Sequence, residues 1–320
     1  MRRVVQFFWG PADPRTYALV RIFLAFAGLV NLIDLWPHRY EYCAATGMIS
    51  LSIIHKLTQG GLYTSVFFWV TSERGVDAVF LVAATALVTL GLGLFTRASA
   101  ALVFAWHVSY SIRAFPVLHS WDAVLRVYSF IILISPSARV WSLTHWLSSA
   151  RSTQGTERTT SPKKDDGDDV PIYGVRLMQW QLFVIYLMTF WLKAPDPFWR
   201  NGQLLAYFSV SLYSRTPDDL LMVRHEWISA VTTYASLAIE VSVPWLLSFR
   251  RTRAYGMLAG FALHAMIAAT AKLGVFSISM IPPYMAFLDR GNVDWLVQRA
   301  RTVRARLGRR AAPSGAGESS

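Results

Sequence analysis

The sequence predicts an all-α fold, a polytopic membrane helical bundle with about eight transmembrane helices. Of the 320 residues, 54% are hydrophobic and only 16% are charged, and the mean hydropathy is +0.35. These values are typical of integral membrane proteins. Several apolar runs approach the roughly 20 residues that a helix needs to cross a bilayer. The basic residues also gather in alternate connecting segments, as expected when successive segments face opposite sides of a membrane.

Eight apolar segments are the candidates for these helices. In chain order they are Tyr17–Trp36, Ala78–Phe95, Ala98–Phe115, Ala123–Ile134, Leu177–Leu192, Ile228–Phe249, Tyr255–Ala271 and Gly274–Leu288. The fourth and the last are short, so each either crosses with its flanking residues or re-enters. Segments 40–71 and 195–227 contain apolar pieces that are too short to span. We expect interfacial or re-entrant helices there, on the outer side.

The distribution of lysine and arginine predicts the orientation. With the N-terminus in the cytoplasm, about 20 of the 31 basic residues lie in cytoplasmic segments and about nine lie outside. This asymmetry predicts a multi-pass protein of the cell inner (cytoplasmic) membrane, a bacterial inner membrane, with both termini cytoplasmic. The net charge of +12 is explained by basic loops that contact anionic lipid, and nucleic acid is not an expected partner.

Cysteine and histidine usage excludes two further classes of site. Cys43 is the only cysteine, so the chain has no internal disulfide and no cysteine metal cluster. The seven histidines lack the spacing of metal ligands. We therefore expect no metal.

The chain is expected to form one transmembrane domain over residues 1–290 and a basic cytoplasmic tail over residues 291–320. Within the domain, the polar segment 148–169 is expected to be a disordered cytoplasmic linker. The tail alternates arginine with small and apolar residues, which predicts a surface helix at its start. The sequence has no internal repeat, which weakens the interpretation of a transporter built from inverted repeats.

A lysine ends the fifth apolar segment. The run that begins near Arg176 stops at Lys193, and a Pro-Asp-Pro turn and Trp199 follow. A charged amine is costly at the edge of hydrocarbon, so one interpretation is an uncharged Lys193 that acts as a base. The alternative is a lysine that reaches the interface and stabilises the helix end. Tyr186 lies on the same helix face, and Trp199 belongs either to a ligand pocket or to an aromatic belt.

Other ionisable residues also lie at membrane depth. Asp122 and Arg126 share one helix face and form either an intrahelical ion pair or a functional polar pair. Glu240 precedes Pro244 by four residues, and this proline leaves the Glu240 carbonyl without its helical partner. His264 is expected at a similar depth in the next helix. Its imidazole either pairs with the Glu240 carboxyl group or lies in the core with its hydrogen bonds made to other groups.

The order of several motifs resembles the horizontally transferred transmembrane (HTTM) domain. This is the membrane portion shared by vitamin K-dependent gamma-carboxylases and many bacterial proteins. The resemblance covers about residues 13–288. Its motifs are ALVRIF (18–23), GLGLFTR (91–97), WDAVLR (121–126), WS (141–142), YLMTFWLK (186–193), WRNG (199–202), EVSVP (240–244), and His264 followed by FS (276–277).

The resemblance implies a function. In the carboxylases, an active-site lysine starts the oxygenation of vitamin K hydroquinone. The oxygenated product removes a glutamate γ-proton, and carbon dioxide then adds in a lyase-type reaction. The matching lysine is Lys193, so the implied activity is a quinone-linked oxygenase or carboxylase with a reduced quinone of the vitamin K or menaquinone type. The implied pocket residues are Tyr186, Trp199, Glu240 and His264, with Asp122 and Arg126 as a supporting polar pair.

Two departures from the carboxylases keep a second function open. This chain has Trp121-Asp122 where the carboxylases have an Asn-His pair, and it has no long extracytoplasmic C-terminal region after the last predicted span. The alternative is a non-catalytic membrane factor for the maturation or interaction of a secreted peptide or protein. The expected partners are membrane lipids, a quinone and such a secreted chain. Whether the protein is an enzyme is not decided by the sequence.

Overall fold

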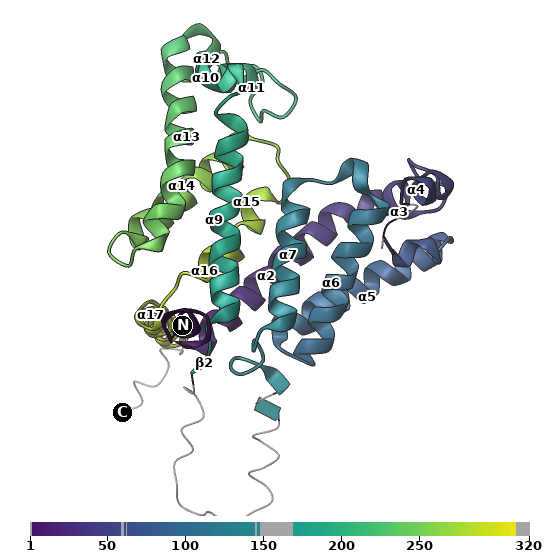
Figure 1. Cartoon of the computed structure of the whole chain (residues 1–320), viewed down its shortest axis with the longest axis vertical. Coiled ribbons are helices and arrows are strands. Elements are labelled where there is room, and N and C mark those ends of the chain that lie inside the picture. The colour runs from purple at the N-terminus through teal and green to yellow at the C-terminus, as the bar shows by residue number, and fades with distance from the viewer. Residues whose placement is uncertain (1, 59–60, 62, 145, 148–168, 312–320) are drawn as a thin grey trace, which may run out of the picture. The chain divides into compact units, whose positions relative to one another are not determined.

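The computed structural model describes residues 2–58, 61, 63–144, 146–147 and 169–311. The chain divides into two units, residues 1–287 and residues 288–320. Both are helical (Figure 1), which confirms the all-α prediction. The predicted linker 148–169 lies outside the described residues except at its last position.

In the first half of the first unit, the helices and strand have the following bounds. They are α1 (Arg2–Trp9), β1 (Pro11–Ala12), α2 (Pro14–Leu35), η1 (Trp36–His38), α3 (Arg39–Cys43), α4 (Leu51–Thr58), η2 (Val66–Phe68), α5 (Glu73–Leu92), α6 (Thr96–Arg113), η3 (Phe115–Val117) and α7 (Ser120–Ile134).

The second half begins with β2 (Val170–Pro171), which pairs antiparallel with β1. The helices that follow are α9 (Tyr173–Lys193), α10 (Pro197–Arg200), α11 (Leu204–Ser209), α12 (Leu221–Arg224), α13 (Glu226–Ser248), α14 (Arg253–Thr270), α15 (Phe276–Ser279) and α16 (Ile281–Met285). The second unit contains α17 (Arg290–Ala311). A helix was expected at the start of the basic tail.

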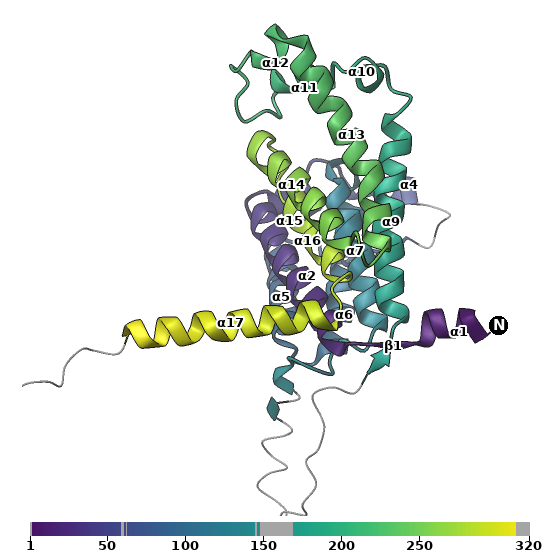
Figure 2. The ribbon, with the colours of Figure 1, turned by 90° about the vertical axis from the view of Figure 1, so that its left-hand side faces the viewer.

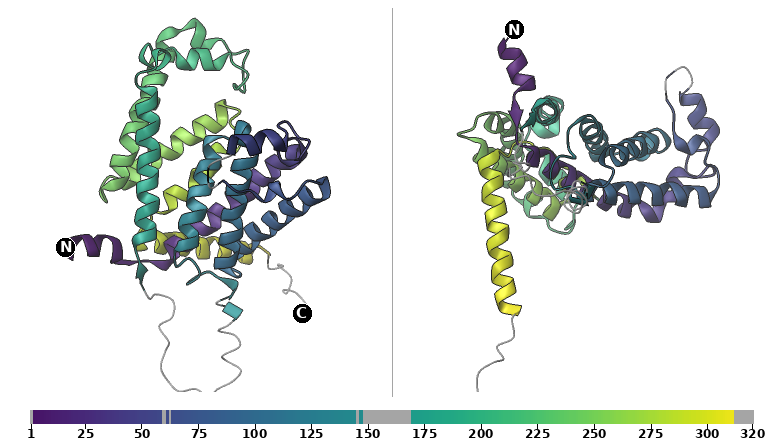
Figure 3. Two further views of the ribbon diagram at one scale, coloured as in Figure 1. Left: turned by 45° about the vertical axis from the view of Figure 1, so that its right-hand side comes forward. Right: turned by 90° about the horizontal axis from the view of Figure 1, so that it is seen from below.

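Two groups of long helices make up the first unit (Figures 1 and 3). One group contains α2, α5, α6 and α7, and the other contains α9, α13 and α14. In the second group α13 packs against both α9 and α14 (Figure 2). The short helices α15 and α16 connect the groups, because α16 packs against both α2 and α9 and α15 packs against α7 and α14.

Four helical segments in the described part of the chain are long and apolar enough to cross a membrane. They are Pro14–Cys43, Glu73–Leu92, Tyr173–Lys193 and Glu226–Ser248. The count of eight spans is therefore not confirmed. Helices α6 and α14 have 18 residues each and α7 has 15. These three helices lie close to the third, seventh and fourth predicted segments, but they are not among the four that are long and apolar enough to cross.

The last predicted segment is not one continuous helix. Residues 274–288 form the two short helices α15 and α16, and the second begins at Ile281-Pro282-Pro283. Proline cannot donate the backbone hydrogen bond that continues a helix. Both prolines and Tyr284 are buried, so the segment is apolar because it lies inside the protein. The short helices expected in segments 40–71 and 195–227 are present as α3, α4, α10, α11 and α12.

Arg21 joins α2 to the segment after α7. Its guanidinium is fully buried and donates to the carbonyls of Ser137 and Trp141, at 2.5 Å each. The Arg21 side chain therefore turns into the protein and fixes the loop after α7.

Gly93 ends α5 with a left-handed backbone, at a φ of 73°. A Cβ atom at this position would lie 2.7 Å from Ser142 Cα and 3.0 Å from an Arg21 nitrogen. The Gly93 carbonyl accepts hydrogen bonds from Ser142 and Thr144. Only glycine satisfies both the backbone angle and the close approach.

We expect Gly93→Ala to destabilise the protein by about 2 kcal/mol, because left-handed strain and the contact with Ser142 add. Thermal unfolding of the purified protein in detergent measures this loss. Gly291→Ala is the control, because a Cβ there meets nothing closer than 3.5 Å and the φ of Gly291 is not positive. Equal melting temperatures for Gly93→Ala and the wild type would contradict the expectation.

Candidate functional site

Lys193 and Glu240 form an ion pair between α9 and α13. Lys193 is the last residue of α9, and its Nζ contacts Glu240 Oε1. The lysine side chain is 30% exposed and the glutamate side chain is 9% exposed. A partly buried charge of each sign is therefore neutralised by the other. The predicted acid–imidazole pair of Glu240 with His264 is not formed among the described residues, because Glu240 bonds Lys193 instead.

The turn after α9 brings Trp199 back onto Lys193. The Asp196 side chain accepts hydrogen bonds from the backbone N–H groups of Phe198 and Trp199, and Pro197 occupies the first turn of α10. Both features favour the start of a helix. As a result, Lys193 Nζ lies 4.7 Å from the centre of the Trp199 ring. This distance is within the range of a cation–π interaction.

A chain of hydrogen bonds runs from Tyr186, two turns before Lys193 on α9. The Tyr186 hydroxyl lies 2.9 Å from His264 Nε2 of α14 and also bonds the Tyr284 hydroxyl of α16. All three residues are buried. Gly260 of α14 makes this approach possible, because a Cβ there would collide with the Tyr284 hydroxyl. The predicted pocket residues Tyr186 and His264 are thus in direct contact.

The motif around His264 also makes direct contacts. The Ser277 hydroxyl donates to the His264 carbonyl at 2.9 Å, and the Phe276 ring lies 5.4 Å from the imidazole. These contacts fix α14 against α15. They hold the imidazole plane beside Tyr186.

Two polar atoms in this region have no hydrogen-bond partner in the described part of the chain. They are Glu240 Oε2 and His264 Nδ1, and both are fully buried. Buried polar atoms without a partner are rare in folded proteins. We call Lys193, Glu240, Tyr186, His264 and Tyr284 the lysine cluster. The cluster has hydrogen-bonding capacity that the protein does not use.

Asp122 and Arg126 lie elsewhere, in α7. Asp122 accepts a hydrogen bond from the His119 backbone N–H at 2.9 Å and a longer one from the Asn31 amide at 3.4 Å. Within the described residues, no ion pair joins Asp122 to Arg126. The reason is that Asp122 lies in the first turn of α7, where its carboxylate caps the helix. Trp121 also bonds Asn31, through its indole N–H at 3.0 Å.

Asp122 and Trp121 line a cavity of about 580 Å³. Its wall also includes Tyr42 of α3, Tyr213 from the segment after α11 and Lys272 from the segment after α14. Gly274 lies close against the Trp121 ring. None of the lysine cluster lines this cavity. The structure therefore divides the predicted site residues between two places, the lysine cluster with Trp199 and the cavity beside Asp122, and Arg126 belongs to neither.

Two residues that contact the predicted site residues, Asn31 and Tyr284, were not predicted from the sequence. Asn31 is an amide near the C-terminal end of the apolar helix α2, a signal that a polar partner lies nearby. Tyr284 lay within a segment interpreted as a span, where a tyrosine suggests a membrane interface. Its role depends on the break at Pro282-Pro283, which apolar composition does not reveal.

Comparison with known proteins identifies the family. The family model for the HTTM domain matches residues 9–295, nearly the whole chain. No curated protein and no solved structure matches the chain significantly. The match contains the lysine cluster and the cavity beside Asp122, and it confirms the resemblance inferred from the motifs. The chain therefore belongs to the HTTM domain family, a family of membrane domains related to gamma-carboxylase.

Proposed function

We propose that this protein is a membrane enzyme that removes a proton from a reduced quinone, with Lys193 as the base. The observation that carries the proposal is the lysine cluster itself. It brings an amine, a carboxyl group, an imidazole and two phenols together from four helices. Titratable groups gathered in a partly buried place are typical of sites for acid–base chemistry.

The unused atoms of the cluster fit a hydroquinone. Such a molecule has two hydroxyl groups, which donate and accept hydrogen bonds. Glu240 Oε2 can accept a hydrogen bond, and His264 Nδ1 can donate or accept one according to its tautomer. The Trp199 indole can pack against an aromatic ring. When bound, the quinone would supply the oxygen chemistry, which no protein side chain can supply.

The Lys193–Glu240 pair can release and accept a proton internally. In a site with little water, the proton of an ion pair can move from the ammonium to the carboxylate, which leaves both groups uncharged. The Lys193 nitrogen then holds a free electron pair. It takes the proton of a substrate hydroxyl and becomes the ammonium again, while Glu240 keeps its own proton. Lys193 Nζ is thus the atom that receives the proton.

An apolar substrate has a direct path to Lys193 from the lipid. Trp191 and Leu192 precede the lysine on α9 and are 71% and 69% exposed. Exposed apolar side chains on a membrane helix face lipid. The proposal therefore includes lateral entry of the quinone from an inner membrane, with both termini on the cytoplasmic side.

The test is a quinol oxidation assay with the purified full chain. Reduced menaquinone or vitamin K is added without oxygen, oxygen is then admitted, and the oxidised and epoxide products are measured by chromatography. We expect product in excess of a protein-free control, with carbon dioxide incorporation into an added peptide if the reaction continues to carboxylation. Absence of both quinol turnover and quinol binding would overturn the enzyme proposal.

A second candidate is a non-catalytic factor for the maturation or interaction of a secreted peptide or protein. The observation that favours it is the cavity of about 580 Å³, whose aromatic, acidic and basic wall suits a polar peptide segment and does not include Lys193. This candidate predicts peptide or protein binding with no quinol chemistry. The same assay therefore separates the two.

A further inference from the structure

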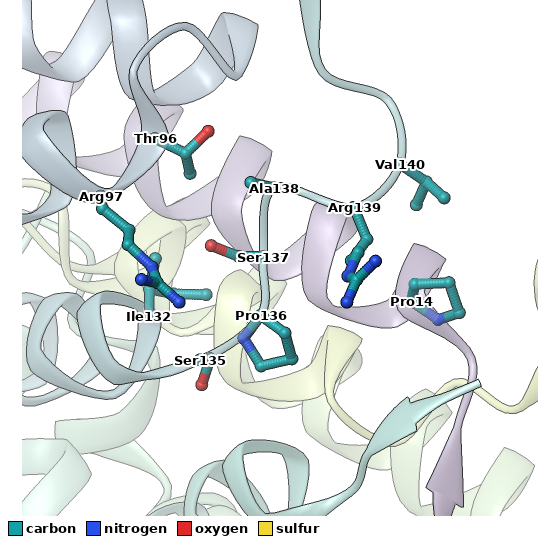
Figure 4. Close-up of a pocket in the computed structure, with 10 residues that line it drawn as sticks. All are labelled: Pro14, Thr96, Arg97, Ile132, Ser135, Pro136, Ser137, Ala138, Arg139 and Val140. Carbon is teal, nitrogen blue, oxygen red and sulfur yellow. The ribbon is translucent and has the colours of Figure 1, made fainter. Parts of the chain in front are cut away.

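A second cavity, of about 280 Å³, lies where α6 begins and α7 ends (Figure 4). We call it the arginine cavity. Its wall comes from the start of α2, the first turn of α6 and the loop 135–140. None of the predicted site residues lines it. The residues that matter for its chemistry are Thr96, Arg97, Ser137 and Arg139.

Two guanidinium groups flank this cavity. In Figure 4, Arg97 and Arg139 extend on either side of the chain at Pro136 and Ser137. Neither guanidinium group has an ion pair or hydrogen bond with any residue that the structure describes. Two cations near one another are stabilised by an anion between them.

A third cation lies behind the cavity wall. The buried Arg21 guanidinium donates to the carbonyl of Ser137, a wall residue. Among the described residues it forms no ion pair with a carboxylate, and its Nε has no partner. A buried charge without a counter-ion is costly. An anion in the arginine cavity would therefore also stabilise Arg21.

Two hydroxyl groups of the wall are unused. Among the described residues, neither the Thr96 Oγ1 nor the Ser137 hydroxyl has a hydrogen-bond partner, and the two residues are 5% and 4% exposed. In Figure 4 the Ser137 hydroxyl points to the Arg97 side of the cavity. Hydroxyl groups beside arginines are donors that phosphate oxygens accept.

The first turn of α6 adds to the positive potential. This helix has 18 residues, and its N-cap residue Phe95 offers no side-chain bond to the free N–H groups. Helix N-termini bind anions through these groups and through the helix dipole. Asp13 is an acidic residue that precedes the wall residue Pro14 in the sequence. Its carboxylate forms an ion pair with Arg15 at 2.6 Å.

We propose that the arginine cavity binds a phosphate group. The shared chemistry is an oxyanion with one or two negative charges, held by Arg97, Arg139 and the two hydroxyls. A phospholipid headgroup is the source that the position favours, because the cavity lies at the start of the apolar helix α2, and headgroups meet a membrane protein at the ends of its apolar helices. Free phosphate is the other source.

The experiment measures binding to the full chain in a non-ionic detergent. Titrations use phosphatidylglycerol in mixed micelles, phosphatidylcholine in the same micelles, and inorganic phosphate, with the melting temperature as the readout. We expect the melting temperature to rise with phosphatidylglycerol or with phosphate. Arg97→Gln and Arg139→Gln should each weaken this binding by about tenfold, because each removes a charge-assisted hydrogen bond.

Arg251→Gln is the matched control, since it removes the same charge from an exposed position in the α13–α14 turn. It should leave binding unchanged. Stabilisation by phosphatidylglycerol but not by phosphate identifies the lipid as the source, and stabilisation by both identifies the phosphate group alone as sufficient. The proposal is overturned if neither ligand stabilises the protein, or if Arg251→Gln weakens binding as much as Arg97→Gln does.

Discussion

Replacing Lys193 with arginine is expected to slow quinol oxidation by about a thousandfold while leaving the melting temperature nearly unchanged. A general base contributes roughly 10²- to 10⁴-fold to a reaction rate. Arginine keeps the positive charge and can still pair with Glu240, but it does not lose its proton in proteins. The substitution therefore removes the base and preserves the ion pair.

The measurement is the initial rate of quinol consumption after oxygen is admitted, for protein matched in amount and monodispersity. Lys56→Arg is the control, because Lys56 is an exposed lysine of α4. Its rate should equal that of the wild type. If Lys193→Arg retains more than about a tenth of the wild-type rate, Lys193 is not the base, whatever the protein binds.

Replacing Glu240 with leucine is expected to destabilise the protein by about 3 kcal/mol. The change leaves the Lys193 amine in a partly buried position without its counter-ion, and breaking one side of such a pair typically costs several kcal/mol. The lysine is 30% exposed, so it can partly turn to water, and we expect the lower end of that range. Unfolding by titration with a denaturing detergent gives the free energy.

The double variant Glu240→Leu with Lys193→Met is expected to recover most of this loss, to within about 1 kcal/mol of the wild type. Replacing both partners of a buried pair by apolar groups is often neutral. The exposed pair of His38 with Glu41, at 3.0 Å, provides the comparison. Glu41→Leu should change stability by less than about 0.5 kcal/mol. A double variant no more stable than Glu240→Leu would show that the cost does not come from the unpaired amine.

The sequence predicted the position of Lys193 well, because that position depends on local signals. An apolar run, a lysine and a Pro-Asp-Pro turn together specify a helix end, and α9 ends at Lys193. The partner of Glu240 could not be predicted in this way. Lysine and histidine were both available at a similar depth, and the choice depends on how α13 is rotated against α9 and α14.

The break in the last predicted segment was missed for a different physical reason. Hydropathy measures whether side chains avoid water, and it does not distinguish lipid from protein interior. The residues of α16 are buried between α2 and α9, so they satisfy the same hydropathy criterion as a lipid-facing helix. The consecutive prolines at 282 and 283 were the available signal against a continuous helix. The pairing of Asp122 with Asn31 was likewise hidden, since the two residues are 91 positions apart.

The short α15–α16 segment has a consequence for how the domain could be subdivided. Tyr284 contributes a hydroxyl to the lysine cluster of one helix group, while its own helix packs against α2 of the other group. Neither group is therefore an autonomous module. A fragment made of α9, α13 and α14 alone would lack a phenol beside Tyr186, and transplanting those helices into an unrelated scaffold would not carry the complete chemistry with them.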